Sequence, residues 1–289
     1  MNAPDKITLH DVQSQPDSRN ICIDAVGIKG MRYPVTIQAG ERLVPTIATL
    51  SMTVGLAAIA KGTHMSRFIE LLEAHSGTLD MLRFKGIVLD MLDRLQAHSG
   101  AIEMRFPYFV KKTAPISGVQ SQLDYDICWQ GRVSDKGKYS LWMHVMVPAT
   151  SLCPCSKAIS DYGAHNQRSC ISIKAEITDE MQIEELIGIA ERSASCEVYG
   201  LLKRPDEKYV TERAYDNPKF VEDLVRDVAL SLNQDPRVGT YVVEAENFES
   251  IHNHSAFAQI TRPSSTDRPI QRKERQGQNL QLLVSRGLA

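Results

Sequence analysis

The residues best suited to chemistry lie in the segment from 151 to 169, SLCPCSKAISDYGAHNQRS. Cys153 and Cys155 flank a proline, and His165 follows twelve residues after Cys153. A thiolate and an imidazole from one loop could share a metal ion. A structural zinc site would need four Cys or His ligands in paired spacings, and the sequence has no CxxC or HxxxH pair. The pattern therefore favours an open, catalytic site.

One alternative accompanies this interpretation. The cysteines can be reduced, packed thiols and His165 a loop histidine, which is the commoner fate of an arbitrary CxC pattern. The polar residues that follow the cysteines favour the reactive site. Further along the chain, His252 and His254 stand at strand spacing, which would place both imidazoles on one face of a strand.

Composition limits the class of protein. The chain has 289 residues, of which 43% are hydrophobic and 24% charged, as in a folded globular protein of one large or two smaller domains. Six cysteines are too few for a disulfide scaffold and no apolar signal segment opens the sequence, so we expect reduced thiols and a cytoplasmic location. The most apolar stretch, residues 43–60, is interrupted by polar residues and is not typical of a membrane span. A net charge of −2 without a Lys and Arg stripe argues against nucleic-acid binding.

The elements that position these residues can be predicted from periodicity. Alternation predicts strands and three-to-four spacing predicts helices, with loose boundaries. The expected order is a short strand, a strand, two helices and two strands, followed by the same order again; the ranges are 33–38, 46–56, 65–72, 79–100, 102–111, 119–133, 139–147, 169–177, 183–195, 218–233, 241–248 and roughly 254–260.

This order predicts an α+β fold made of two tandem ββααββ units with antiparallel sheets. The first unit spans residues 33–133 and the second 134–262, which contains the cysteine segment. Residues 1–32 form an N-terminal extension and residues 263–289 a polar tail that we expect to be mobile. Open sheets expose their edges, which favours closing strands from several subunits into a shared barrel. A self-contained α+β domain is the alternative.

Three strings carry a resemblance to a known family. SLCPCSKAISDYGAHNQRS, KGTHMSRFIELL at 61–72 and NFESIHNHSAFA at 247–258 closely resemble GTP cyclohydrolase of type IB, and the similarity spans most of residues 34–262. The resemblance implies the tunnelling fold (T-fold), with two ββααββ units per chain, four chains per particle and active sites between subunits. It also implies conversion of GTP and water to 7,8-dihydroneopterin triphosphate and formate, the first step of tetrahydrofolate biosynthesis.

That reaction needs water to attack C8 of guanine, and a divalent metal stabilises the hydroxide required. The resemblance implies that the metal ligands are Cys153, His165 and Glu207. We therefore count Cys153 as catalytic. Viewed alone, a glutamate such as Glu207 is more often a solvated charge, here beside Lys208. One sulfur, one nitrogen and one carboxylate do not select zinc, so the donor set leaves the metal open. The resemblance implies Mn²⁺ or Zn²⁺, with Fe²⁺ as a third candidate. Cys155 either supports the site or is merely packed.

The resemblance also suggests roles in binding and proton transfer. His252 would donate a proton to guanine N7, while His254 assists it, approaches the metal or contacts substrate. One of the pair can instead only support the strand. Glu249 would orient His252 or contact substrate. Glu222, at the start of a helix, would accept hydrogen bonds from the guanine edge, or simply favour the helix terminus. The triphosphate would be bound by residues that could also be ordinary surface groups: His64, Ser66 and Arg67 of a neighbouring subunit, and Lys157 and Arg168.

Two rival functions make different demands on the same residues. A 7-cyano-7-deazaguanine reductase of this fold would use NADPH and would make Cys153 a covalent nucleophile. A non-catalytic metal- or purine-binding oligomer would close the fourth metal position and show no turnover. Metal dependence of the reaction separates both rivals from the cyclohydrolase.

Overall fold

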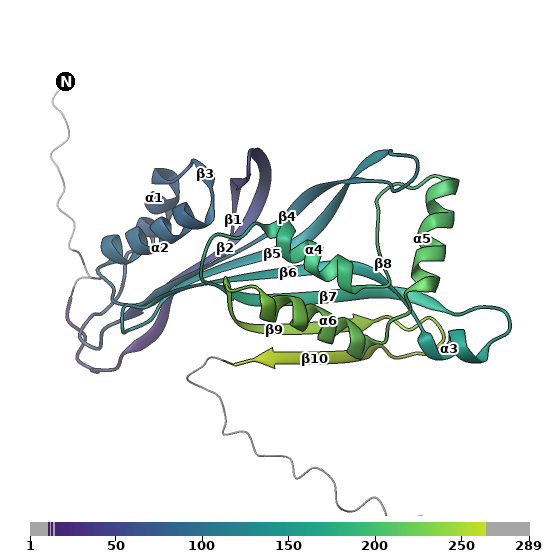
Figure 1. Ribbon diagram of the computed structural model, residues 1–289. Helices are drawn as coiled ribbons and strands as arrows, with labels where there is room; N and C mark the ends of the chain where they lie inside the picture. The colour runs from purple at the N-terminus through teal and green to yellow at the C-terminus, as the bar shows by residue number, and fades with distance from the viewer. Residues whose placement is uncertain (1–10, 12, 14, 264–289) are drawn as a thin grey trace, which may run out of the picture.

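The computed structural model describes residues 11, 13 and 15–263, and its strands form one large sheet (Figure 1). The strand order is β10-β9-β7-β6-β5-β4-β2-β1-β3, with β8 paired to β6. All neighbours are antiparallel except β1 and β3. The strands are β1 (Ile23–Ala39), β2 (Arg42–Leu56), β3 (Thr78–Leu79), β4 (Gly100–Thr113), β5 (Gln120–Val133), β6 (Tyr139–Leu152), β7 (Asn166–Ile177), β8 (Cys196–Glu197), β9 (Val238–Asn247) and β10 (Ala256–Arg262).

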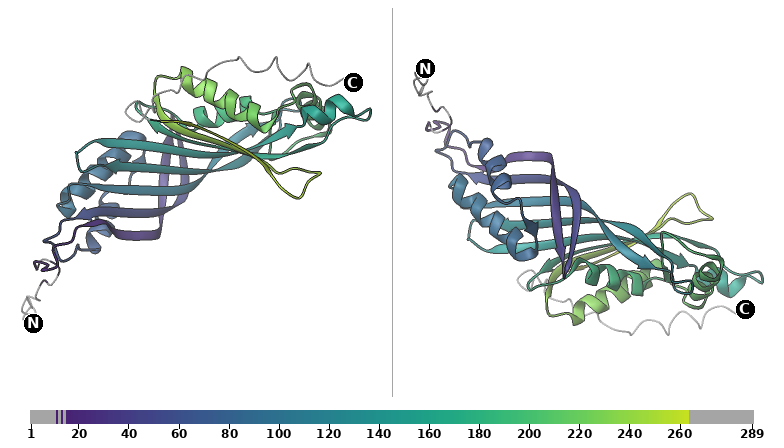
Figure 2. Two further views of the ribbon diagram at one scale, coloured as in Figure 1. Left: turned by 90° about the horizontal axis from the view of Figure 1, so that it is seen from below. Right: turned by 90° about the horizontal axis from the view of Figure 1, so that it is seen from above.

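Helices lie over one face of this sheet and at one of its ends (Figure 1). They are α1 (Ser66–Ala74), α2 (Met81–Leu95), α3 (Pro154–Ile159), α4 (Ile183–Ser193), α5 (Arg204–Asp216) and α6 (Val221–Gln234). Phe84 of α2 packs edge-on against Trp129 of β5, and Trp129 pairs across the strands with Met143 of β6. Cross-strand partners share a face, so the buried rows of β5 to β9 lie beneath both helix pairs. Figure 2 shows α1 and α2 over one end of the twisted sheet, and α4 and α6 over the other.

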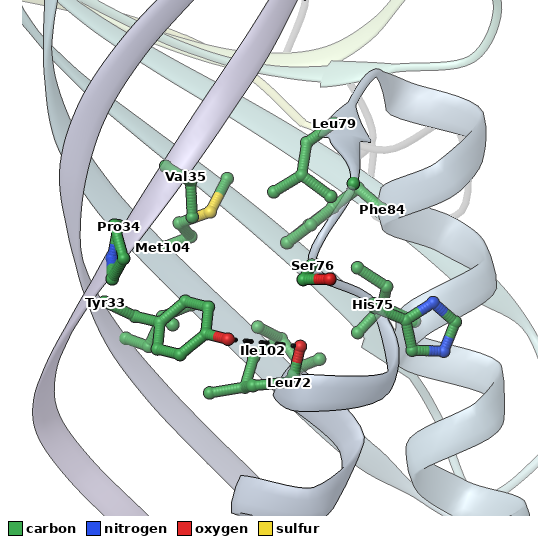
Figure 3. A pocket seen from close by; sticks show the side chains of 13 residues that line it. Tyr33, Pro34, Val35, Leu72, His75, Ser76, Leu79, Phe84, Ile102 and Met104 are labelled. Carbon is green, nitrogen blue, oxygen red and sulfur yellow. Dashed lines mark hydrogen bonds between the residues drawn. The ribbon is translucent and has the colours of Figure 1, made fainter.

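Packing is close beneath the first helix pair. A cavity of about 20 Å³ remains between β1, β2, β4 and the two helices, which is room for about one water molecule. Tyr33 reaches across it to donate a hydrogen bond to the Leu72 carbonyl at 3.5 Å (Figure 3). The region between the sheet and this helix pair is therefore a closely packed, mainly apolar core.

The α+β class is confirmed, and most expected strands and helices are present. The structure adds α3, α5 and the two-residue strands β3 and β8. β1 begins at Ile23 and so includes residues 23–32, which we assigned to the N-terminal extension. The strand expected from about residue 254 begins instead at Ala256, so the expectation that His252 and His254 share a strand face is wrong. The expected mobile tail lies outside the described residues from 264 onward, and no helix in the described part is long and apolar enough to span a membrane.

Candidate functional site

The segment that contains the two cysteines joins neighbouring strands at one end of the sheet. β6 pairs with β7 up to Leu152 opposite Asn166, and β7 pairs with β9 up to Ser169 opposite Asn247. Cys153 directly follows β6, and His165 directly precedes β7. The Cys153 amide donates a hydrogen bond to the His165 carbonyl at 3.1 Å. The thiol and the imidazole therefore extend from two backbone positions that are hydrogen-bonded to each other.

The loop is closed by its own side chains. Cys153 is the N-cap of α3, and its Sγ accepts from the Ser156 amide at 3.4 Å. Pro154 occupies the first turn, where a missing N–H costs nothing. The Ser156 hydroxyl donates to the Cys153 carbonyl at 3.2 Å and accepts from the His165 amide at 3.3 Å. One serine thus links both candidate ligands.

A buried polar cluster lies beneath this loop. The Ser169 hydroxyl is 2.7 Å from both Ser151 Oγ and Asn247 Oδ1. All three residues are at most 2% exposed. On the other side, the Leu152 amide donates to the fully buried Ser195 hydroxyl at 3.1 Å. Buried polar groups persist where they are satisfied, so this cluster fixes the ends of β6, β7 and β9 relative to one another.

The His165 imidazole is surrounded by three polar side chains. Its Nδ1 lies 3.0 Å from Gln167 Oε1, 3.4 Å from Ser250 Oγ and 3.9 Å from Glu249 Oε2. The structure therefore places Glu249 beside His165. His252 and His254 lie in the exposed loop between β9 and β10, where their rings stack with centroids 5.0 Å apart.

Glu207 lies elsewhere on the chain. It is exposed in the first turn of α5. The opposite end of α5 contacts α3: the Lys157 ammonium donates to the Tyr215 carbonyl and lies 4.2 Å from the centre of its ring. With a rise of 1.5 Å per residue, Glu207 is about 12 Å along the helix from Tyr215. The helix itself does not bring Glu207 toward Cys153.

The helix is held in that position at its N-terminus. Asp206 is fully buried and accepts hydrogen bonds from Ile116, Ser117 and Lys203 at 2.6–2.8 Å. Burial acts to raise the pKa of Asp206, but these hydrogen bonds outweigh it and hold the pKa well below its usual value. Further along, Arg213 pairs with Glu197 of β8 at 2.8 Å.

These positions determine how many of the expected metal ligands one chain brings together. Cys153 and His165 offer the thiolate and imidazole donors that suit a divalent transition metal. In the part of the chain that the structure describes, no three His, Cys, Asp or Glu side chains are grouped closely enough to hold one. Of the three expected ligands, one copy brings Cys153 and His165 together, whereas Glu207 lies on α5.

The other cysteines are less suited to reaction or metal binding. Burial raises the pKa of Cys128 and of Cys196 to about 11 each, and burial also raises the pKa of Cys170. These thiols remain protonated at neutral pH and act as packed side chains. Cys155 is exposed on α3, next to the candidate site.

The predicted substrate-binding residues divide into two groups. The start of α6 lies beside the cysteine loop, because the Lys219 amide donates to the Leu152 carbonyl at 3.1 Å. Glu222 is exposed in the first turn of that helix, and Arg168 is exposed on β7. The other group, His64, Ser66 and Arg67, lies at the start of α1, at the far end of the sheet from α3 (Figure 1).

Two side chains of that second group already contact other residues of the same chain. His64 Nε2 is 3.2 Å from Asp11, and Arg67 donates to the Arg94 carbonyl at 2.9 Å. A groove of about 750 Å³ lies between the two helix pairs, and none of the predicted site residues lines it. Within one chain, the structure does not bring the triphosphate candidates of α1 to Cys153.

Sequence reasoning missed Gln167, which is 7% exposed and contacts both His165 and Glu249. A signal was present, because Gln167 stands two residues after His165 at the start of a strand, where alternate side chains share a face. It also missed Asn247 as the acceptor of the buried serines, although that residue lies in the predicted strand 241–248.

Comparison with known proteins gives consistent results. Residues 9–258 match the family model described as type I GTP cyclohydrolase folE2. A protein of Dechloromonas aromatica named GTP cyclohydrolase FolE2 1 is 58% identical over 262 residues, covering 90% of this chain and 98% of its own. GTP cyclohydrolase FolE2 of Cupriavidus necator is 56% identical over 259 residues, covering 90% and 97%.

Among solved structures, a uricase from Arthrobacter globiformis superposes with a TM-score of 0.51 at 8% identity, covering 86% of this chain and 96% of the uricase. At that identity the likeness concerns the fold alone, and it confirms the tunnelling fold class expected from the sequence.

Proposed function

The chain belongs to the type I GTP cyclohydrolase FolE2 family, and we propose that it performs this reaction with a divalent metal bound between copies of the chain. Membership makes it a GTP cyclohydrolase I, which converts GTP and water to 7,8-dihydroneopterin triphosphate and formate in folate biosynthesis. The matches to cyclohydrolases give no support to the rival nitrile reductase. The proposal concerns the metal, the assembly and the roles of individual residues.

The metal proposal rests on the placement of Cys153 and His165. A backbone hydrogen bond joins these two residues where β6 ends and β7 begins. When bound, the metal, Mn²⁺ or Zn²⁺ with Fe²⁺ as a third candidate, would supply a Lewis acid that activates water. Glu207 completes the set as a carboxylate from a neighbouring copy. This explains why Glu207 stands about two helical turns from the α5 residue that contacts α3.

The sheet edges support an assembly of several copies. β10 pairs only with β9 among the described strands, and β1 pairs with the short β3 only at Thr36 and Ile37. Unpaired edges of this length favour pairing with another chain. We propose a homotetramer, in which His64, Ser66 and Arg67 of one copy bind the triphosphate beside the cysteine loop of another. Six free thiols are consistent with a cytoplasmic enzyme.

The remaining roles follow from placement. Glu222, beside the loop, accepts hydrogen bonds from the 2-amino and ring N–H groups of guanine. Lys157 and Arg168 are further phosphate candidates, although Lys157 already contacts Tyr215. His252 donates a proton to N7 as water attacks C8, and His254, stacked against it, assists or contacts substrate. Glu249 acts through His165, which it approaches at 3.9 Å, or contacts substrate.

The test uses purified, metal-stripped protein given GTP, with Mn²⁺ or Zn²⁺ added back separately. We expect formate release and neopterin fluorescence to return together with metal. Full activity in the metal-stripped protein, or no activity with any of the candidate metals, would overturn the metal proposal. Oxidation of NADPH with 7-cyano-7-deazaguanine would point instead to a nucleophilic Cys153.

A further inference from the structure

Gln167 connects a carboxylate to the candidate ligand His165. It lies at the start of β7 and is 7% exposed. Its Oε1 is 3.0 Å from His165 Nδ1, and its Nε2 is 3.5 Å from Glu249 Oε1. The side chains of His165 and Glu249 are 16% and 14% exposed. Three polar side chains therefore form a largely buried row at the site.

The chemistry of the amide fixes the direction of this row. A glutamine oxygen only accepts hydrogen bonds and its nitrogen only donates them, while an ionised carboxylate only accepts. The NH₂ group must therefore face Glu249, because the opposite orientation would set the amide oxygen against the carboxylate. The amide oxygen then faces His165 and accepts from Nδ1.

A neutral imidazole carries one N–H, so a proton on Nδ1 leaves the lone pair on Nε2. Ser250 Oγ, 3.4 Å from Nδ1, can accept from the same hydrogen. Glu249 Oε2, at 3.9 Å from Nδ1, is too far for a hydrogen bond. The interaction that selects the tautomer is therefore the one with Gln167.

We propose that Gln167 is a positioning residue that holds His165 in the Nδ1–H tautomer, with Nε2 free to bind the metal, and that Glu249 in turn orients Gln167. The inference rests on the proposed metal site. Outer partners of a ligating histidine usually contribute 10–100-fold in metal affinity. Gln167 would do so through a neutral amide between the carboxylate and the imidazole.

The experiment measures Co²⁺ and Zn²⁺ affinity of the apo full-length protein by competition with a chromophoric chelator. Gln167→Met keeps the length of the side chain and removes the acceptor, whereas Gln167→Glu keeps an acceptor. Gln259→Met is the matched control, since Gln259 also donates its amide to a carboxylate, Glu244 at 2.6 Å, but on β10.

We expect Gln167→Met to weaken metal affinity about 10–100-fold while the thiolate-to-Co²⁺ absorption band persists, because Cys153 still binds. Gln167→Glu keeps an acceptor toward Nδ1 but sets a second carboxylate against Glu249, so its affinity should lie between those of wild type and Gln167→Met. Gln259→Met should be unchanged. Turnover of Gln167→Met should recover at saturating metal, which a general loss of folding would not allow; the melting temperature of each variant checks this.

The outcomes separate the inference from the proposal beneath it. Tight metal binding by wild type with equal affinity in Gln167→Met would overturn the positioning role alone. Wild-type protein that binds no metal would overturn both. If Gln167→Met melts early, Gln167→Glu decides: an affinity loss as large as that of Cys153→Ala despite a normal melting temperature would refute the role of the acceptor.

Discussion

The part from β1 to β5 and the part from β6 to β10 use the same scaffold differently. Each places two helices on one face of its strands. Of the eight buried polar residues in the described chain, only Thr63 lies in the first part; the second has Ser151, Gln167, Ser169, Ser193, Ser195, Asp206 and Asn247. The second part also contains the added elements α3, β8 and α5.

The difference indicates where the fold depends on particular side-chain partners. An apolar core tolerates changes that preserve volume, whereas a buried polar group requires its particular partner. Four of the polar residues of the second part, Ser151, Gln167, Ser169 and Asn247, lie at the ends of β6, β7 and β9, beside Cys153 and His165. The first part instead offers His64, Ser66 and Arg67 at a partly exposed helix start, which suits a contribution to a neighbour's site.

The largest expected effect separates ligand from scaffold. Cys153→Ala should lose bound metal, and turnover should fall at least about a hundredfold, because one donor and the N-cap of α3 disappear together. Metal content by atomic spectroscopy and formate release measure this. Met91→Ala is the control from the first part, since its side chain is fully buried in α2: it should destabilise by about 2–5 kcal/mol with unchanged metal stoichiometry. Full metal content and rate in Cys153→Ala would refute the ligand assignment.

Next in size is a variant that keeps metal but loses turnover. His252→Ala should reduce kcat about 10²–10⁴-fold, the usual contribution of a general acid. The same metal assay should show normal content, because His252 lies in the exposed β9–β10 loop. Comparison with His254→Ala assigns the proton donor, and loss of metal from His252→Ala would move it into the ligand set.

Mixing of subunits tests whether the two parts meet across copies. Cys153→Ala and Glu207→Ala should each be inactive alone. When the two variants are unfolded together and refolded as mixed oligomers, some interfaces combine an intact Cys153 with an intact Glu207, so partial activity should return. Activity that stays at the level of the separate variants would place both ligands within one chain.

A smaller effect concerns the polar cluster under the loop. Asn247→Leu removes the acceptor for Ser169 and should cost about 1–3 kcal/mol, since buried hydroxyls lose a partner. Denaturant unfolding measures it. Because the groups share one network, adding Ser169→Ala should cost less than the sum of the single changes. Strict additivity would show that the cluster does not act as a unit.

What the sequence could predict depended on apolar periodicity. The strand at 139–147 and the helix at 218–233 have regular buried rows, and both were predicted from them. α5 was missed because only Asp206 and Ala214 are buried in RPDEKYVTERAYD, so it has no apolar stripe. Its position depends on the buried Asp206 and on the ion pair between Arg213 and Glu197 of β8, which no local pattern shows.

The site was predicted in part for the same reason. Cys153 and His165 could be paired because they flank one loop, and the family resemblance supplied their role. The side-chain contacts of Gln167, Glu249 and Asn247 arise from strands that pair across 80 or so residues, as the separation of 82 between Gln167 and Glu249 shows. Alternation predicted which face such residues occupy but not which partner they meet.

The smallest expected effect compares two ion clusters distant from the cysteine loop, one in each part. In the second, hydrogen bonds from Arg237 lower the pKa of Glu185 and of Asp235. In the first, burial acts to raise the pKa of Asp90, but hydrogen bonds from Arg94 and His75 leave it lowered. A carboxyl with a lowered folded-state pKa stabilises above its unfolded value, about 4, and loses this contribution as pH falls through the folded value.

Arg237→Met should therefore cost on the order of 1 kcal/mol at pH 7, with solvent screening limiting the gain of partly exposed pairs. The gap to wild type should close as pH falls from about 5 toward 2. Arg94→Met should show the same dependence with a smaller gap, because Arg94 pairs with one carboxylate whereas Arg237 pairs with two. Unfolding free energies across pH measure both, and a gap that widens in acid would contradict the assigned pairing. If both variants keep their metal content, metal binding depends on the polar residues beneath Cys153 and not on these ion clusters.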